Sequence, residues 1–287
     1  MDNKIFNTEK LPEQYLEKTP LFFGTDPGLF NTLNKPYPKI WSLYKTMKSL
    51  DWSEDEFDYT QCNIDFKNCP KSVSDMMIRT LAWQWEADSV ASKSIAPLLA
   101  PFISDSSLWA AWQRISDNEV IHAATYSEIV RMSFDNPESV MADILAVKES
   151  IARMDTVNEV FSNLHRASHN YALGNMPVEE AYDHVFMAVV ALLILERVQF
   201  MSSFSVTFTI CSSNWFQPVG KAVQKIAQDE LEVHAELDKE VIRTELATDR
   251  GRAAYERLKP KIKQLLDEVV AAEMARSEYL FSEGRVS

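Results

Sequence analysis

The sequence predicts an all-α protein, built as a bundle of long helices with an irregular N-terminal arm. Only 6 of its 287 residues are glycine. Apolar residues recur with the 3.6-residue period of helices over long stretches, whereas the period-two alternation of half-buried strands is scarce. Short connections between the helical stretches favour antiparallel neighbours, which is the arrangement of a helix bundle.

The elements follow from local signals along the chain. Residues 1–35 form the predicted arm, because prolines and glycines interrupt the stretch KTPLFFGTDPGLFNTLNKPYP. Helix-breaking residues separate the helices predicted after it. The predicted helices are 36–49, 70–98, 104–132, 137–171, 177–212, 215–245 and 250–282. No linker-like segment divides them, so we expect residues 1–287 to form a single domain.

The composition argues against several classes of protein. With 46% apolar and 25% charged residues, the chain is globular rather than disordered. A formal net charge of -13 gives nucleic acid and anionic membranes little to attract them. The scattered cysteines Cys62, Cys69 and Cys211 are predicted to be free thiols, and the apolar run Val185–Leu195 is too short to span a membrane. We expect a soluble, cytoplasmic protein that binds neither nucleic acid nor membrane.

Ionisable residues occur where the apolar face of a predicted helix should continue. In the stretch SDNEVIHAATYSEIVRM, Glu119, His122 and Tyr126 fall on one helical face. The other residues of this kind are Asp88, Glu196, Glu230 and His234. Burying an unpaired carboxylate costs several kcal/mol, so helices that each bury an acid need a shared partner. A metal centre would provide it.

The donor set favours iron or manganese. Four carboxylates and two imidazoles suit these metals, and no thiolate is placed to favour zinc or copper. Helix bundles hold dinuclear centres with one acid from each of two helices and a Glu–His pair from each of two others. The chain supplies Asp88, then Glu119 with His122, then Glu196, then Glu230 with His234. Each pair follows its single acid by about 30 residues, as an internally duplicated helix hairpin would place it.

Each signal taken alone has a structural alternative. A single Glu-x-x-His on a helix is more often a solvated or salt-bridged face. Asp88 could pair with a lysine, and Glu196 could bind Arg197 or a neighbouring helix. The remaining histidines are interpreted as ordinary core or surface residues: His165, His169 and His184. The conjunction of the four buried acids in the right order favours the dinuclear centre.

At these residues the sequence resembles the small, radical-generating subunit of class I ribonucleotide reductase. The resemblance covers about residues 15–283 and is carried by ADSV around Asp88, DNEVIHAATYSEIV, LERVQFMSSF and IAQDELEVH. Ferritins and acyl desaturases share the acids and histidines, but they have no reason to keep a redox-active phenol one turn beyond His122. Tyr126 therefore distinguishes the families. The resemblance implies a ferritin-like bundle with additional helices.

The resemblance also implies the ligand assignment. Asp88, Glu119 and His122 would hold one metal ion. Glu196, Glu230 and His234 would hold the other, with Glu119 and Glu230 bridging. The oxidised dinuclear iron, manganese or mixed centre would leave a stored tyrosyl radical on Tyr126.

Further residues receive a role from the same resemblance. Phe200, Phe204 and Ile226 match the apolar wall that the family places around the radical. Trp52 in LDWSEDEF matches a tryptophan that connects the site to the surface through hydrogen bonds with His122 and Asp229. Without the resemblance, Trp52 would be interpreted as a buried core residue and the phenylalanines as plain packing.

Two features depart from the family pattern. Glu230 and His234 are four residues apart where the family spaces the pair by three, so we predict a π-bulge or an altered ligand set there. The stretch AAEMARSEYLFSEGRVS resembles one after which family members continue with a tail that anchors the large subunit and carries a relay tyrosine. Our hypothesis is that a separately encoded C-terminal fragment supplies this segment, and the alternative is a truncation.

These observations predict a homodimeric small subunit that serves the large catalytic subunit of ribonucleoside-diphosphate reductase without binding the nucleotide itself. A ferritin-like di-iron oxidase or desaturase is one alternative, which would turn over an organic substrate and tolerate Tyr126→Phe. A non-enzymatic iron-binding or scaffold protein is another, which would bind far more than two ions per chain or none. Identical ligand types serve iron and manganese, so the metal stays open.

Overall fold

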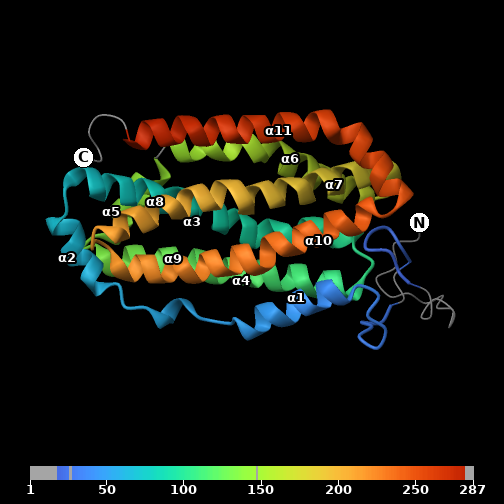
Figure 1. Cartoon of the computed structure of the whole chain (residues 1–287), viewed down its shortest axis with the longest axis horizontal. Helices are drawn as coiled ribbons and strands as arrows, with labels where there is room; N and C mark the ends of the chain where they lie inside the picture. Colours follow the sequence, from blue (N-terminus) through green and yellow to red (C-terminus); the bar gives the residue numbers. More distant parts are fainter. Residues whose placement is uncertain (1–17, 26–27, 147, 282–287) are drawn as a thin grey trace.

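The computed structural model describes residues 18–25, 28–146 and 148–281. Its centre is formed by two separate helices and two long composite ones, which run along the long axis of the molecule (Figure 1). The separate helices are α3 (Lys71–Leu99) and α4 (Ser106–Ser133). The first composite helix is α7 (Val178–Ile194), a π-helical segment (Leu195–Phe200) and α8 (Met201–Ser212). The second is α9 (Gln217–Asp229), a π-helical segment (Glu230–His234) and α10 (Ala235–Leu246).

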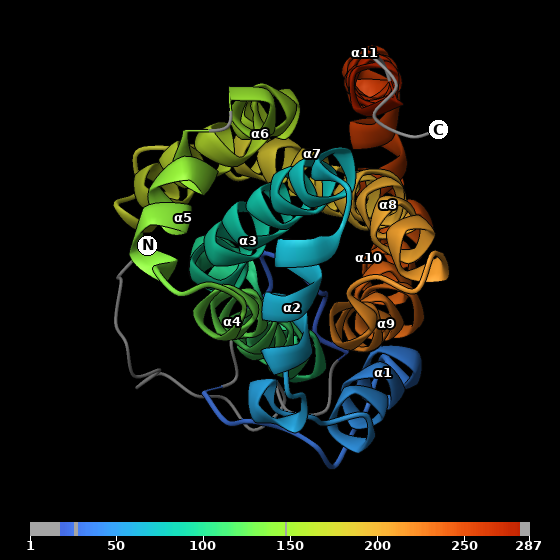
Figure 2. The same cartoon turned by 90° about the vertical axis from the view of Figure 1, so that its left-hand side faces the viewer.

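Shorter or peripheral elements surround this centre. They are α1 (Pro38–Ser49), α2 (Thr60–Asn68), α5 (Pro137–Leu145), α6 (Lys148–Ala172) and α11 (Asp249–Phe281), with 3₁₀ turns at Glu54–Glu56 and Ala100–Phe102. Seen end-on, α11 lies at the outer edge of the molecule (Figure 2). In the described part of the arm, residues 18–25 and 28–35 form no helix, and Phe22 pairs with Ile103 in an isolated bridge. The all-α prediction is confirmed.

The helix predictions were wrong in two places. The helix α2 was not predicted, because its mostly polar sequence TQCNIDFKN carries a weak apolar stripe. The helix predicted over 137–171 is broken in two, since α5 ends at Leu145 and α6 begins at Lys148. The two halves pack in different places: Ile144 of α5 contacts residues of α3 and α4, whereas Leu164 of α6 lies in the core beside α7.

Two large clusters of the apolar core follow each other along the bundle axis, and the polar site lies between them. The first cluster includes Trp112, Leu192 and Val233, and the second includes Tyr126 and Phe200. On α3 the second cluster ends at Ala87 and the first begins at Ala91, so Asp88 falls at the boundary. The same division occurs on α4 around Glu119 and on the second composite helix around Glu230. The candidate ligands therefore lie at one level of the bundle.

One helix among the described residues, Val178–Ser212, is long and apolar enough to cross a membrane. It is longer than the apolar run noted in the sequence, because the helix continues through the π-helical segment. Most of its apolar window, 67%, is buried inside the bundle. This burial is typical of the core helix of a water-soluble protein.

Candidate metal centre

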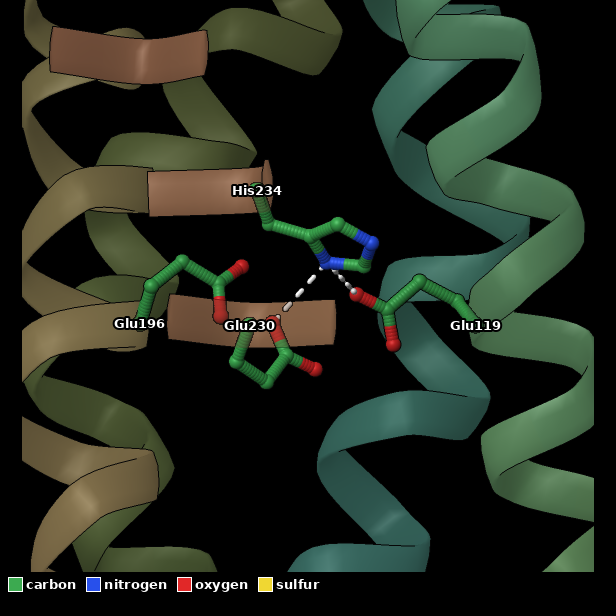
Figure 3. A group of neighbouring side chains, drawn as sticks. All are labelled: Glu119, Glu196, Glu230 and His234. Carbon is green, nitrogen blue, oxygen red and sulfur yellow. Dashed lines mark ion pairs between the residues drawn. The ribbon is translucent and has the colours of Figure 1, made fainter. Parts of the chain in front are cut away.

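The six candidate ligands lie together inside the bundle. Donor atoms of Glu119, Glu196, Glu230 and His234 all lie within 4.8 Å of one another, and so do donor atoms of Asp88, Glu119 and His122. Figure 3 shows the side chains of the first group pointing toward one another. None of the six is more than 2% exposed. Because Glu119 belongs to both groups, the two groups meet at one carboxylate.

Two of the carboxylates contact both histidines. Glu230 lies 3.2 Å from Nδ1 of His122 and 2.9 Å from Nδ1 of His234. Glu119 lies 3.5 Å from the same nitrogen of each ring. A carboxylate that lies close to a nitrogen of each histidine is placed to contact ions held by either ring. The geometry thus supports Glu119 and Glu230 as the bridging pair.

The four-residue spacing of the second pair is accommodated by the backbone. Residues Glu230–His234 form a π-helical segment inside an otherwise α-helical run, so the predicted π-bulge is confirmed. The wider turn absorbs the additional residue and keeps both Glu230 and His234 on the face that points into the site. A second π-helical segment, Leu195–Phe200, carries Glu196 and was not predicted. Both distortions occur at candidate ligands, where π-bulges are frequently found.

The unpaired oxygens of the site fit a bound cation. No carboxylate oxygen of Asp88, Glu119 or Glu230 accepts a hydrogen bond of ordinary geometry, and neither does Oε2 of Glu196. Buried polar atoms are nearly always paired in folded proteins, so such a concentration of unpaired acceptors points to an ion. Carboxylates and imidazoles are the donors that iron and manganese accept. The residues present therefore fit a dinuclear centre.

The pKa values of the acids in the metal-free site differ from their usual ranges, and a bound cation would change them. Burial, reinforced by nearby carboxylates, raises the pKa of Asp88 and of Glu196 well above the usual range. Burial alone would also raise the pKa of Glu230, but His234 and its other partners outweigh it and hold that pKa well below the usual range. Without metal, Asp88 and Glu196 thus hold their protons to a higher pH than ordinary carboxyl groups do. Metal binding should release them.

This proton retention predicts a pH-dependent stability for the metal-free protein. Burial raises the pKa of Asp238 to about 8, so the stability contributed by its protonated form is lost as the pH rises through 8. Burial alone would lower the pKa of His234, but the charge of Glu230 outweighs it and raises the pKa to about 10. The stability contributed by this imidazolium is fully present below pH 6.5 and is lost as the pH rises through 10. As the pH rises, both groups therefore lower the stability of the metal-free protein.

We therefore expect the Tm of metal-free protein to fall by at least about 3 °C between pH 6.5 and pH 10. Metal-loaded protein should show a smaller decrease, because bound metal keeps the carboxylates ionised and the histidines neutral over this range. Scanning calorimetry of both forms over the same pH series measures the difference. Parallel pH profiles for the two forms would contradict this electrostatic description.

Tyr126 is sealed inside the second apolar cluster. Its side chain is fully buried and its hydroxyl has no hydrogen-bond partner among the described residues. Burial, and then the charge of Asp88, raise the pKa of Tyr126 well above 10. Phe200, Phe204 and Ile226 are members of the same cluster and are equally buried. The surroundings therefore keep the phenol protonated and exclude water from it.

A hydrogen-bonded path connects the site to Trp52. The indole Nε1 of Trp52 donates to Oδ2 of Asp229 at 2.7 Å, and the same oxygen lies 3.2 Å from Nε2 of His122. The rings of Trp52 and His122 are nearly parallel, with centroids 6.0 Å apart. His122 thus faces the acids through one nitrogen and Asp229 through the other. Trp52 is 6% exposed, so a small part of its side chain reaches the surface.

Arg153 of α6 belongs to the surroundings of the site but was not singled out from the sequence. Its guanidinium forms an ion pair with Glu273 of α11, lies over the ring of Trp83 at 3.5 Å, and donates to the backbone carbonyl of Gln199. The amide of Gln199 donates back to the carbonyl of Arg153 at 3.2 Å. These contacts tie α6 and α11 to the π-helical segment that carries Glu196. An arginine in a helical stretch gives no sequence signal of such a role.

Replacing Arg153 with methionine should lower the free energy of unfolding by about 3–5 kcal/mol, because Glu273 would remain buried without its partner. In the double variant Arg153→Met, Glu273→Met, neither member of the ion pair is left without its partner, and most of the lost stability should return. Chemical denaturation of the wild type and both variants measures this. A double variant as unstable as the single one would show that the unpaired charge is not the cause.

The remaining histidines lie away from the site, as predicted. His165 and His169 are exposed near each other on α6, and His184 is half-buried on α7. None of them belongs to a group of potential metal ligands within the described ranges. The three cysteines are free.

The sequence matches a known protein family over most of its length. Residues 29–286 match the family described as ribonucleotide reductase, small chain. The ribonucleoside-diphosphate reductase subunit beta of Haemophilus influenzae is 24% identical over 282 residues, which cover 93% of this chain and 75% of that protein. The ribonucleoside-diphosphate reductase 1 subunit beta of Escherichia coli O157:H7 is 23% identical over 225 residues, or 74% of this chain and 60% of that protein. The chain thus spans only part of these relatives.

Solved structures share the fold. The ribonucleotide reductase R2 subunit from Clostridium botulinum matches with a TM-score of 0.84 at 18% identity, over 99% of this chain and 84% of that one. An R2-like ligand-binding oxidase with a reconstituted Mn/Fe cofactor matches with a TM-score of 0.64 at 15% identity, over 88% of this chain and 84% of that one. At these identities the likeness shows the fold alone. It confirms the predicted ferritin-like bundle.

Proposed function

The chain belongs to the family of ribonucleotide reductase small chains, and from this premise we propose that it generates and stores the radical used by the large subunit of a class I ribonucleoside-diphosphate reductase. The observation that carries the proposal is the arrangement of two ligand groups that share Glu119, with a sealed phenol, Tyr126, two turns farther along the same helix. An oxidase or a storage protein needs the ligands but has no use for that phenol.

In the proposed site, Asp88, Glu119 and His122 would hold one metal ion. Glu196, Glu230 and His234 would hold the second, and Glu119 and Glu230 would be the ligands shared between them. The contacts of these two carboxylates with both histidines support this division. When bound, iron or manganese would supply the one-electron oxidation chemistry with dioxygen. The ligands themselves fix the two ions inside a dry, carboxylate-rich pocket, and His122 is oriented by Asp229.

Tyr126 is the proposed site of the stored radical. Because its pKa is raised, the phenol keeps its proton at neutral pH, and losing an electron requires that the hydroxyl proton leave as well. Asp88 is the acid whose charge acts most strongly on the phenol, and we propose that its carboxylate would accept the proton once the two groups come within hydrogen-bond distance, since neither has a hydrogen-bond partner among the described residues. The apolar wall of Phe200, Phe204 and Ile226 keeps reductants and water away from the oxidised ring.

Trp52 is the proposed exit of the radical toward the large subunit. It reaches the proposed ligand His122 through a single carboxylate oxygen of Asp229. An electron can therefore travel to the site while the protons along this path stay hydrogen-bonded. The position of Trp52 near the surface supports this role.

The proposal also includes the localisation, the oligomeric state and the metal. The protein acts in the cytoplasm as a homodimer with the large subunit, and the metal is iron, manganese or both.

An activity assay tests the proposed function. Metal-loaded protein mixed with the purified large subunit should reduce ribonucleoside diphosphates, whereas neither protein alone should do so. If the chain instead oxidised an organic substrate on its own and gave no nucleotide reduction, the oxidase alternative would replace the proposal. Binding of many iron ions per chain would favour a storage protein.

A further inference from the structure

An apolar cavity of about 140 Å³ lies between α3, α6 and the first composite helix. Nearly all of its lining side chains are apolar. Its inner wall includes Trp83, Ala87 and Ala91 of α3 and Leu195 of the π-helical segment, all of them buried. At its outer end Val90 is 48% exposed, so the cavity extends toward the surface.

The inner wall of the cavity is formed by direct neighbours of two candidate ligands. Ala87 precedes Asp88 in the chain, and Leu195 precedes Glu196. Ala91 lies one turn beyond Asp88 on α3, at an angle of about 60° around the helix. The two alanines give this wall small side chains at the level of the site. The cavity therefore ends against the backbone of the two helices that carry Asp88 and Glu196.

The candidate metal centre needs a route of this kind, because its ligands are almost completely excluded from solvent. Dioxygen is small, uncharged and apolar, so it enters an apolar cavity without losing hydrogen bonds. Water does not fill such a cavity, since it finds few polar partners there. Close-packed protein cores leave little space for a diffusing molecule, so a preformed cavity beside the site offers it a path.

We propose that this cavity binds dioxygen and conducts it to the buried metal centre, an inference that rests on the proposed function. Val90 and its neighbours form the mouth, and Ala87 and Ala91 form the inner end. An organic molecule with an alkyl chain is the competing occupant. The proposed centre consumes dioxygen and lies beyond the inner end of this cavity, which favours the smaller guest.

Xenon, an apolar atom that binds in dry cavities, tests the binding step without any metal. Crystals of the wild type under xenon pressure should show xenon in this cavity, and crystals of Ala91→Leu should not, because the larger side chain fills the inner end. If wild-type crystals show no xenon there, or show a co-purified organic molecule, the proposal is overturned.

Stopped-flow mixing with dioxygen tests the route. After anaerobic metal loading, the second-order rate constant for radical formation should fall at least about 10-fold in Ala91→Leu, because the larger side chain fills the inner end of the cavity. Val157→Phe narrows the same cavity from α6, away from the ligands, and should slow the reaction in the same way. Ala142→Leu, an equal change at an exposed position of α5, should react like the wild type.

The outcomes separate this inference from the proposed function. If the wild type binds metal but forms no radical, the proposed function fails, and the xenon result still decides whether the cavity binds an apolar guest. If the wild type forms the radical and both filled variants form it at the same rate, the dioxygen route is wrong. Metal content is measured first, because Ala91→Leu lies one turn from Asp88 and could disturb this ligand. Val157→Phe lies away from the ligands and should retain full metal loading.

Discussion

Replacing Tyr126 with phenylalanine is expected to abolish ribonucleotide reduction while both metal ions stay bound. The substitution removes only the hydroxyl, which makes no hydrogen bond among the described residues, so packing in the second apolar cluster should hardly change. A phenylalanine ring has no O–H to lose and cannot store the oxidising equivalent. We expect the activity with the large subunit to fall at least about 10³-fold, because a step that needs this group has no substitute.

The matched control is Tyr59→Phe. Tyr59 is also fully buried in the second cluster, and its hydroxyl also lacks a hydrogen-bond partner. Activity and metal content are measured for both variants under the same loading conditions. If Tyr126→Phe retained the activity of the wild type, the stored radical would have to be assigned elsewhere or abandoned. Equal losses in both variants would point to a general packing defect.

Replacing Trp52 with phenylalanine should separate radical formation from radical use. The variant keeps an aromatic ring beside His122 but loses the indole N–H that donates to Asp229 at 2.7 Å. The metal ligands and Tyr126 are untouched, so the radical should form in normal yield. Nucleotide reduction should nevertheless fall at least about 10²-fold, because the electron path to the surface is interrupted.

Radical yield and activity are measured on the same samples of Trp52→Phe. Trp41→Phe on α1 is the control, because Trp41 is half-buried beside Tyr44 and has no contact with the proposed site. Normal activity in Trp52→Phe would exclude this tryptophan from the path. Loss of the radical together with the activity would show that Trp52 acts in forming the radical rather than in using it.

Much of the fold and of the candidate site follows from one physical constraint. An acid on the apolar face of a helix is costly to bury, so Asp88 and Glu196 stand out in the sequence without any knowledge of the fold. The structure brings them together with Glu119, Glu230 and the two histidines. The four-residue spacing of Glu230 and His234 likewise predicts a backbone distortion, since an ideal helix would turn His234 away from its partner.

Other features depend on contacts between distant segments and leave no local trace. The π-helical segment around Glu196 follows a continuous apolar run, in which no spacing anomaly marks it. Arg153 meets Glu273 across 120 residues of sequence, and neither belongs to a recognisable motif. The helix α2 was missed because it is short and polar, and its position is set by contacts such as the bond from the backbone of Phe216 to Asp65.

Electron paramagnetic resonance combined with metal analysis tests the central claim most directly. Wild-type protein is loaded anaerobically with iron(II) or manganese(II), exposed to dioxygen and frozen. We expect about two metal ions per chain and a tyrosyl signal whose line shape changes when deuterated tyrosine is incorporated. Two bound ions without any tyrosyl signal under either metal, or no bound metal at all, would contradict the proposal that this site generates and stores a radical on Tyr126.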